Sequence, residues 1–521
     1  MTPQEVTKPG VSKWTVALTV MLPTFIEVMD TSVVNVSLPH IQGSMNAGVD
    51  EVTWVLTSYL VSNAIVIPIT GWLAKVFGRR RYLIFSLALF TTSSILCGAA
   101  PSLEILILAR ILQGLGGGGL QPLSQAILLE TFPRREHGIA MAVFGMGVVM
   151  APILGPVVGG WITDQWSWRW VFYINLPAGI LAVVLAMIFV HDPAYIKREV
   201  SKIDKWGLAL LTVGLGTLQI VLDKGEREDW FQSDMIVVLS IIAVVTLVLF
   251  VVVELHTEHP VVDLRILKDQ SFSAGTGIIF LGFFCLFGSI VLLPLYLQQL
   301  MGYTALWAGL VLGPGGISSF LIMPMSGILM KKGVKPRHLL VVGLAITAYA
   351  HWLMAHFNLE AGFWAISIPR FVQGLGLGMF FVPLSAAAYV NISNEQMGNA
   401  SGIFNLVRNL GGSFGVAFST TILSQRAQFH QTMISERITP YNHAFQGYYQ
   451  QICDFLRMNH PDAPCPTGGL AFIYRDVLRQ ASMLSFNDTF YILAAATAVL
   501  VPITFLLRRG RAAKLPGAGM H

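Results

Sequence analysis

Long apolar runs, each bounded by short segments rich in Gly, Pro or charged residues, recur along the whole chain. Their lengths match a helix that crosses the hydrocarbon core of a bilayer. The pattern predicts fourteen membrane-spanning helices, at residues 14–38, 53–74, 82–99, 103–127, 138–161, 170–190, 205–223, 235–255, 272–299, 304–328, 338–356, 361–389, 397–423 and 485–507. An even number of spans places both termini on the same side of the membrane.

The composition agrees with this pattern. Hydrophobic residues make up 54% of the 521 residues and charged residues only 12%, about half the charged fraction of a typical soluble protein. The first apolar run begins at Trp14 and continues without a small-residue cleavage site, so we expect a retained helix rather than a signal peptide. These features predict an all-α polytopic membrane protein.

Lys and Arg set the predicted orientation. With the N-terminus inside, basic residues gather in the cytoplasmic segments at 75–81, 134–135, 197–205, 265–268, 331–337 and 508–514. This bias follows the positive-inside rule and places both termini in the cytoplasm. The net charge of +5 therefore reflects membrane topology rather than a nucleic-acid partner. Residues 424–484 become a long outer loop, which either docks a partner or is a loosely ordered linker.

The chain repeats itself. Arg110, Gln113 and Gly114 recur as Arg370, Gln373 and Gly374 at an offset of 260 residues, and the same offset holds across the next predicted helix. A constant offset over two consecutive helices indicates two homologous halves. We predict an N-terminal six-helix bundle at 1–195, two additional helices at 196–265, and a C-terminal six-helix bundle at 266–521.

One apolar stretch, at 147–161, is rich in glycine and proline. These residues cost about 1 and about 3 kcal/mol in an ordinary helix interior. In a bilayer, small residues let helix backbones approach closely, and neighbouring helices satisfy the groups that proline frees. The stretch predicts either a kinked packing helix or a conformational element. Its candidate residues are Gly147, Gly155, Pro156, Gly159 and Gly160.

Several motifs, taken in order, resemble those of the major facilitator superfamily. The stretch at 147–161 is similar to its antiporter motif, residues 110–118 to its fourth-helix motif, and residues 71–81 to the loop between its second and third helices. Residues 29–39 and 168–177 resemble motifs of its fourteen-helix drug:proton antiporters (the DHA2 family). The resemblance implies two six-helix bundles with two extra helices. The loop motif contributes Gly71, Lys75, Gly78 and Arg79 as conformational candidates.

Two details resemble the EmrB branch of these antiporters. One is Lys75 at a position where the general motif has an acid, and the other is the sequence between the two extra helices, at 222–231. The resemblance implies a multidrug efflux pump of the bacterial inner membrane that works with an EmrA-like periplasmic adaptor and a TolC-like outer-membrane channel. Lys75 cannot cap a helix N-terminus as a carboxylate does.

Charged residues inside membrane spans are costly unless they are paired or functional. Glu27 and Asp30 lie three residues apart and share a face of the first helix. Arg110 lies at about the same depth as Asp30, about 12 Å from the helix end at the usual rise per residue. We expect Asp30 to approach Arg110 and to carry the exchanged proton, with Glu27 as second candidate. In the alternative, these acids are structural partners of Arg110 or Asn35.

Polar and aromatic residues within the spans are candidate substrate contacts. Arg370 and Arg408 in the C-terminal half would favour anionic or weakly acidic lipophiles. Interhelical hydrogen bonding, and lipid or neighbour contacts for the aromatic residues, are the structural alternatives. The candidates are Glu27, Asn35, Gln113, Gln121, Gln125, Phe284, Tyr296, Gln298, Arg370 and Arg408.

Cysteine is sparse, and its positions differ in kind. Cys97 and Cys285 lie in apolar runs and are expected to pack. Cys453 and Cys465 share the long outer loop and are the candidates for a disulfide outside the cytoplasm.

Other chemistry is not indicated. The chain has no phosphate-binding loop for ATP, no HExxH zinc helix and no Gly-x-Ser-x-Gly elbow. We therefore expect no enzyme, metal or cofactor, and a proton gradient as the energy source. The predicted function is proton-coupled export of lipophilic compounds. Export of a single metabolite or fatty acid is the main alternative, and a membrane scaffold or receptor is less favoured.

Overall fold

The computed structural model describes residues 12–192, 204–439, 441–459 and 465–506, which form helices and no strand. The N-terminal half comprises α1 (Lys13–Met45), α2 (Val49–Phe77), α3 (Arg79–Ala99), α4 (Leu103–Gly117), α5 (Leu120–Thr131), α6 (His137–Gln165), α7 (Trp170–Tyr173) and α8 (Asn175–Phe189). The next pair is α9 (Lys205–Lys224) and α10 (Asp234–His256). The C-terminal half comprises α11 (Gln270–Leu295), α12 (Ala305–Lys331), α13 (Pro336–Met354), α14 (Phe363–Ala388), α15 (Met397–Ser435), α16 (His443–Asn459) and α17 (Cys465–Ile503).

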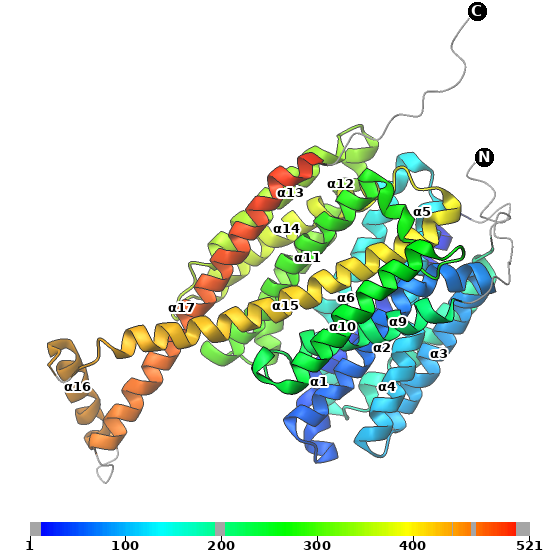
Figure 1. The fold of residues 1–521 in the computed structure, drawn as a ribbon. Coiled ribbons are helices and arrows are strands. Elements are labelled where there is room, and N and C mark those ends of the chain that lie inside the picture. Colours follow the sequence, from blue (N-terminus) through cyan, green and yellow to red (C-terminus); the bar gives the residue numbers. More distant parts are fainter. Residues whose placement is uncertain (1–11, 193–203, 440, 460–464, 507–521) are drawn as a thin grey trace, which may run out of the picture.

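The helices form one elongated bundle (Figure 1). Among the described residues, twelve segments are long and apolar enough to cross a membrane, with α4 and α5 counted as one and α7 and α8 as another. The two other predicted spans, 338–356 and 397–423, fall on α13 and α15, which are not among the twelve. The all-α multi-pass architecture is confirmed. The count of fourteen and the domain boundaries stay predictions, and residues 195 and 196 lie outside the described residues.

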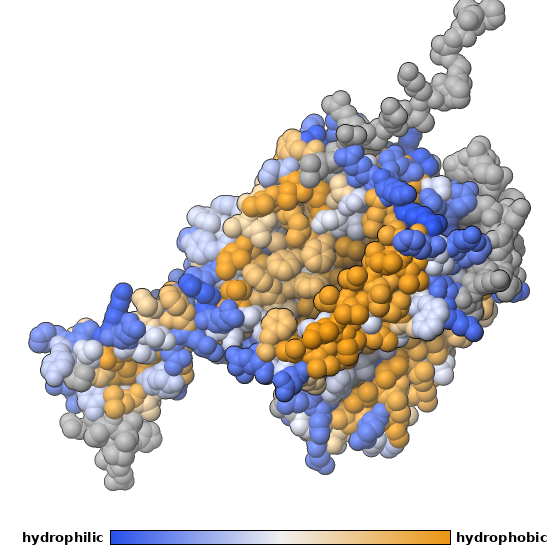
Figure 2. All heavy atoms as spheres, in the orientation of Figure 1, coloured by the Kyte–Doolittle hydropathy of each residue, from blue (hydrophilic) through white to orange (hydrophobic). Residues whose placement is uncertain are grey.

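Apolar side chains cover the outside of the bundle. Figure 2 shows hydrophobic side chains across its middle and hydrophilic ones towards both ends. On α10, residues such as Ile241 and Val244 are 58% and 63% exposed. A surface of this kind is stable when lipid covers it, because no water then contacts the apolar groups.

One end of the bundle, here called the basic end, gathers the start of α1 and the end of α17. Lys13 of α1 and Lys331 of α12 both donate to Glu136, and the Arg337 guanidinium lies 3.8 Å from the Phe505 ring centroid. The first and last described helices therefore begin and end on one side, as an even number of spans requires. That this side is cytoplasmic stays a prediction.

The sequence repeat appears as two equivalent helix crossings at the basic end. A β-carbon at Gly71 of α2 would lie 2.6 Å from the Asn399 backbone nitrogen of α15, and one at Gly327 of α12 would lie 2.9 Å from the Gly138 carbonyl oxygen of α6. Gly138 and its repeat partner Gly398, the neighbour of Asn399, are 260 residues apart. In both crossings a helix of one half presses against a glycine-bearing helix of the other.

The glycine-rich stretch at 147–161 forms part of α6 and packs against α1. β-Carbons at Gly147, Gly155 and Gly159 would meet Met21, Ser32 and Val33 respectively, whereas one at Gly160 would meet nothing within 4 Å. Close packing against α1 accounts for three of these glycines. Their conformational role stays a prediction.

The segment 424–484 is not the loop that the sequence predicted. α15 continues as helix to Ser435, α16 follows, and α17 begins at Cys465. These extensions and α16 leave the bundle at the end opposite the basic end (Figure 1), and we call residues 424–484 the projection. The alternative of a loosely ordered linker is wrong for its described residues, because intrahelical hydrogen bonds satisfy their backbone. Because this segment is polar, the pattern of apolar runs did not predict its helices.

The structure shows which of the described cysteines are free and which is bonded. Cys97 and Cys285 are free and buried, as expected for packing residues. Cys453 is disulfide-bonded. The side chain of Cys465 lies outside the described residues, so the pairing of these two stays a prediction.

Gly155 and Gly160 offer a matched test of the α6–α1 contact. A β-carbon at Gly155 would lie 2.5 Å from the Ser32 β-carbon, and overpacking of this kind costs about 1–3 kcal/mol. We expect Gly155→Ala to lower the midpoint of thermal unfolding of the purified protein, and Gly160→Ala to leave it unchanged or raise it. Both changes raise helix propensity equally. Equal midpoints would contradict the packing described here.

Candidate transport site

Asp30 lies at the centre of a buried polar cluster in the N-terminal half. Its carboxylate accepts hydrogen bonds from Arg110 at 2.6 Å, Gln113 at 2.9 Å and Asn175 at 2.7 Å. The side chains of Asp30 and Arg110 are both 0% exposed. The predicted approach of these two residues is therefore present, and a charged pair of this kind is the arrangement that a membrane interior tolerates.

Arg110 is held in place by α2. Its Nε donates to the Val55 carbonyl at 3.0 Å, and its guanidinium carbon lies 4.1 Å from the Tyr59 ring centroid. Its Nη1 also donates to Gln113 at 2.7 Å. The pair thus joins α1, α2 and α4 at one point.

Glu27, one turn before Asp30, has a different environment. It accepts hydrogen bonds from Asn63 at 3.0 Å and Tyr59 at 3.3 Å, and from Gln121. Gln121 in turn accepts from Arg408 of α15. Glu27 is thus linked through one amide to an arginine of the other half, while no basic side chain contacts it directly among the described residues.

A central cavity of about 190 Å³ lies between the halves. The N-terminal half contributes residues of α1, α5 and α6, and the C-terminal half residues of α11, α12, α14 and α15. Apolar and aromatic side chains predominate, with Phe283, Phe287 and Phe381 among them. The polar lining comes from Gln121, Ser319, Arg370, Gln373, Arg408 and Asn409.

The cavity holds two arginines without a carboxylate among its lining residues. Arg370 donates to Gln373, and its Nε has no hydrogen-bond partner among the described residues. Arg408 donates to Gln121 and to Asn409, and its Nη1 likewise has no partner in that part of the chain. Neither forms an ion pair within the described part of the chain. Arg370 is the repeat counterpart of Arg110, but it lacks the carboxylate that Arg110 contacts.

Other predicted site residues lie elsewhere. Gln125 is buried at the interface of the halves, where it accepts from Asn405 at 2.5 Å and Tyr389 at 3.3 Å. Phe284 packs on Phe418, with ring centroids 5.2 Å apart. Tyr296 is buried and donates to the Asn358 carbonyl.

Asn35 and Gln298 are both exposed. The structure therefore does not bring Asn35, Phe284, Tyr296 or Gln298 to the cavity. Asn35 does not contact either acid, and Asn175 instead supplies the amide at Asp30.

Residues 20–416 match the sequence pattern of the Major Facilitator Superfamily. The chain belongs to the Major Facilitator Superfamily. This match confirms the predicted family and fold, and it identifies the protein as a transporter rather than an enzyme. Membrane transport is also what two halves around a central cavity can perform.

Relatives within this family are similar over nearly their whole length. The multidrug export protein EmrB of Haemophilus influenzae is 38% identical, covering 92% of this chain and 92% of the relative. EmrB of Escherichia coli K12 is 37% identical, with 97% of each covered. The fatty acid resistance protein FarB of Neisseria gonorrhoeae is 35% identical, covering 95% of this chain and 96% of the relative.

Solved structures support the fold alone, because their identity is low. The human organic anion transporter MFSD10 superposes with a TM-score of 0.59 at 14% identity, covering 94% of this chain and 100% of that chain. The proton:xylose symporter XylE superposes with a TM-score of 0.58 at 14% identity, covering 94% and 96%.

The loop between α2 and α3 contacts acidic residues from distant parts of the chain. Lys75 is exposed. The N-terminus of α3 is instead contacted by Asp192, which follows α8 and accepts from the Arg80 backbone nitrogen at 2.8 Å. Gly78, between α2 and α3, has φ of 85°, which favours glycine. Arg79 forms a buried ion pair with Glu130 of α5.

Hydrogen bonds join the two halves at the basic end. Besides the contact of Glu136 with Lys331, Arg134 donates to the Val390 and Ile392 carbonyls at 3.2 and 3.4 Å. Ser401 donates to the Pro122 carbonyl at 2.8 Å. The basic end is therefore closed. Glu136, Glu130, Asp192 and Asn175 were not predicted, and only Asn175 had a signal, as an amide within the motif at 168–177.

The Asp30–Arg110 pair predicts strong coupling between these residues. Asp30→Asn leaves Arg110 buried without its counter-charge, which costs about 3–5 kcal/mol. We expect the double variant Asp30→Asn/Arg110→Gln to be less destabilised than the sum of the two single variants, as measured by thermal unfolding in detergent. Additive effects would contradict a direct charged contact.

Proposed function

We propose that this protein exports lipophilic compounds across the bacterial inner membrane in exchange for protons. The observation that carries the proposal is the buried Asp30–Arg110 pair, in which Arg110 Nη1 lies 2.6 Å from Asp30 Oδ2, in the half that faces Arg370 and Arg408 across the central cavity. The similarity to EmrB proteins supports drug export, because these relatives are multidrug export proteins by name.

Asp30 is the proposed proton carrier and Arg110 its switch. Protonation of Asp30 removes the negative charge that Arg110 contacts, so the paired arrangement loses its electrostatic stabilisation. Arg110 then relies on Gln113 and the Val55 carbonyl, both of which it already contacts. A rearrangement that separates the pair becomes easier, and the return of Arg110 to Asp30 expels the proton on the other side.

The cavity is connected to Glu27 through Gln121. Gln121 lines the cavity, donates to Glu27 and accepts from Arg408. A compound that binds Arg408 or Gln121 therefore competes with contacts that Glu27 uses. Glu27 is the second proposed proton carrier because this route would couple it to substrate directly.

The projection supports a place in a tripartite system. The projection leaves the bundle at the end opposite the basic end (Figure 1), which the predicted orientation places in the periplasm. A helical element of this size offers a surface for an EmrA-like adaptor, which would lead to a TolC-like channel.

Export of fatty acids is the second candidate function. The similarity to the fatty acid resistance protein FarB favours it, as do the two cavity arginines without an ion-pair partner in the described residues. A long-chain carboxylate presents an apolar tail and one negative charge, and a cavity of aromatic walls and arginine matches both.

Dye efflux tests the coupling. We expect everted vesicles to transport a lipophilic dye only with a proton gradient, and Asp30→Asn to abolish this transport. Asp164→Asn is the matched control, since Asp164 lies near the end of α6 with its side chain 69% exposed. Export that survives Asp30→Asn but fails in Glu27→Gln would move the carrier to Glu27, and export without gradient dependence would refute proton coupling.

A carboxylate pair tests the role of Arg370. We expect Arg370→Gln to weaken binding of a long-chain fatty acid by about tenfold, the effect of one charged hydrogen bond, while binding of its methyl ester is unchanged. Arg337→Gln at the basic end is the control. Equal losses for acid and ester would show that Arg370 does not recognise a negative charge.

A further inference from the structure

The projection stands outside the part of the chain that a bilayer covers. α15 is 39 residues long, or about 58 Å at the usual rise per residue, whereas the hydrocarbon core is about 30 Å thick. α17 is also 39 residues long. Both helices therefore continue well beyond the bundle, and α16 packs on α17 at their far end (Figure 1).

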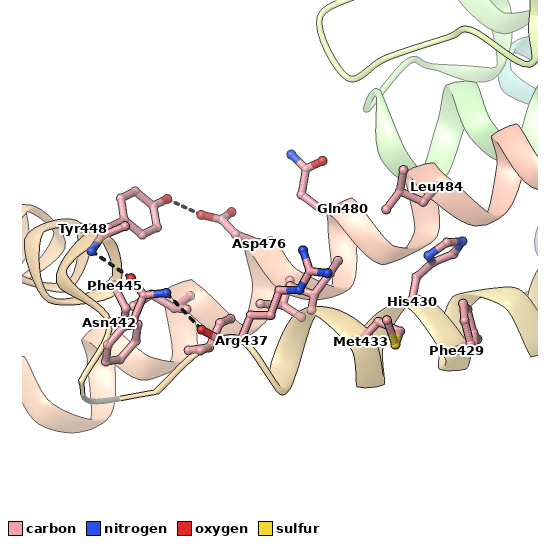
Figure 3. A pocket seen from close by; sticks show the side chains of 15 residues that line it. Phe429, His430, Met433, Arg437, Asn442, Phe445, Tyr448, Asp476, Gln480 and Leu484 are labelled. Atoms are coloured by element: carbon pink, nitrogen blue, oxygen red, sulfur yellow. Dashed lines mark hydrogen bonds between the residues drawn. The ribbon is translucent and has the colours of Figure 1, made fainter.

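A groove of about 680 Å³ lies in the projection, between the extensions of α15 and α17 and the start of α16 (Figure 3). Most of its lining is apolar, and Phe429, Met433 and Leu484 are 48%, 40% and 40% exposed.

Apolar side chains in this position need an explanation. Exposed apolar residues on α10 face lipid, but the projection extends beyond the lipid-covered bundle, so its groove faces water. Contiguous apolar surface with a polar rim, exposed to water, marks a binding site in soluble structures. The volume lies within the range of pockets that take drug-sized molecules, about 300–1,000 Å³.

Arg437 is the group of the groove that would contact a negative charge in the ligand. Asp476, the acid among the lining residues, already accepts a hydrogen bond from the Tyr448 hydroxyl. The backbone carbonyl of Arg437 accepts a hydrogen bond from Asn442 at 3.1 Å. The Arg437 guanidinium makes no hydrogen bond or ion pair with any described residue, and Figure 3 shows the Arg437 side chain between the two helix extensions.

We propose that this groove is a second binding site for lipophilic organic compounds, with an acidic group of the ligand against Arg437 and its apolar body against Met433 and Leu484. The choice of lipophilic compounds as ligands rests on the proposed function, whereas the presence of a binding site does not. The site lies outside the membrane span and separate from the central cavity. It would hold an exported compound in the aqueous phase, where the compound would otherwise partition back into lipid.

Fluorescent probe binding tests the proposal. The probes are 1-anilinonaphthalene-8-sulfonate, an apolar body with an anionic group, and N-phenyl-1-naphthylamine, its uncharged counterpart. Each is titrated into the full-length protein in lipid nanodiscs without a gradient. We expect Met433→Ser/Leu484→Ser to lose a class of sites for both probes, and Arg437→Gln to weaken only the anionic probe, by about tenfold.

The matched control is Met458→Ser/Leu470→Ser, which changes the same residue types in the projection outside the groove, at side chains 77% and 53% exposed. Unchanged titrations of the groove variant, or equal losses in the control, would overturn the proposal and leave the groove to a protein partner. Binding is also measured in Asp30→Asn. Sites that persist there while efflux fails show that groove binding and proton coupling are separate properties.

Discussion

A charge inside a membrane must be matched by a nearby opposite charge or by several hydrogen bonds, and Asp30 and Arg110 meet this requirement together. Their contact draws in Gln113 from α4, Asn175 from α8 and the Val55 carbonyl from α2. One pair thus connects four helices of the N-terminal half, α1, α2, α4 and α8. A change in that pair alters a contact of each of these helices.

The two halves share a sequence repeat but differ in how their buried arginines are paired. Arg110 has a carboxylate, whereas its counterpart Arg370 has the Gln373 amide, and the buried Arg370 Nε has no hydrogen-bond partner among the described residues. Asp30 and Arg110 therefore balance each other's charge, whereas Arg370 and Arg408 have no carboxylate partner among the described residues. Gln121 lies between the halves, because it donates to Glu27 and accepts from Arg408.

Much of this arrangement could be predicted from the sequence, because helical rise and period are fixed. Equal depth placed Asp30 beside Arg110, and the three-residue spacing placed Glu27 on the same face. The rotation of a helix within the bundle could not be predicted in this way. One residue turns a side chain by about 100°, so Phe283 and Phe287 line the cavity while Phe284 faces Phe418. The contacts of Glu136 and Asp192 join segments that are distant in sequence, so no local sequence pattern predicts these contacts.

We expect substrate and proton to compete for this buried network, and proton release measures that competition. A lipophilic substrate is added to purified protein in weakly buffered detergent, and the pH is followed with an indicator dye. We expect the substrate to release protons from the wild-type protein, and to release none from Asp30→Asn, which still binds substrate. Undiminished release from Asp30→Asn, or no release from the wild type, would exclude Asp30 as the group for which substrate and proton compete.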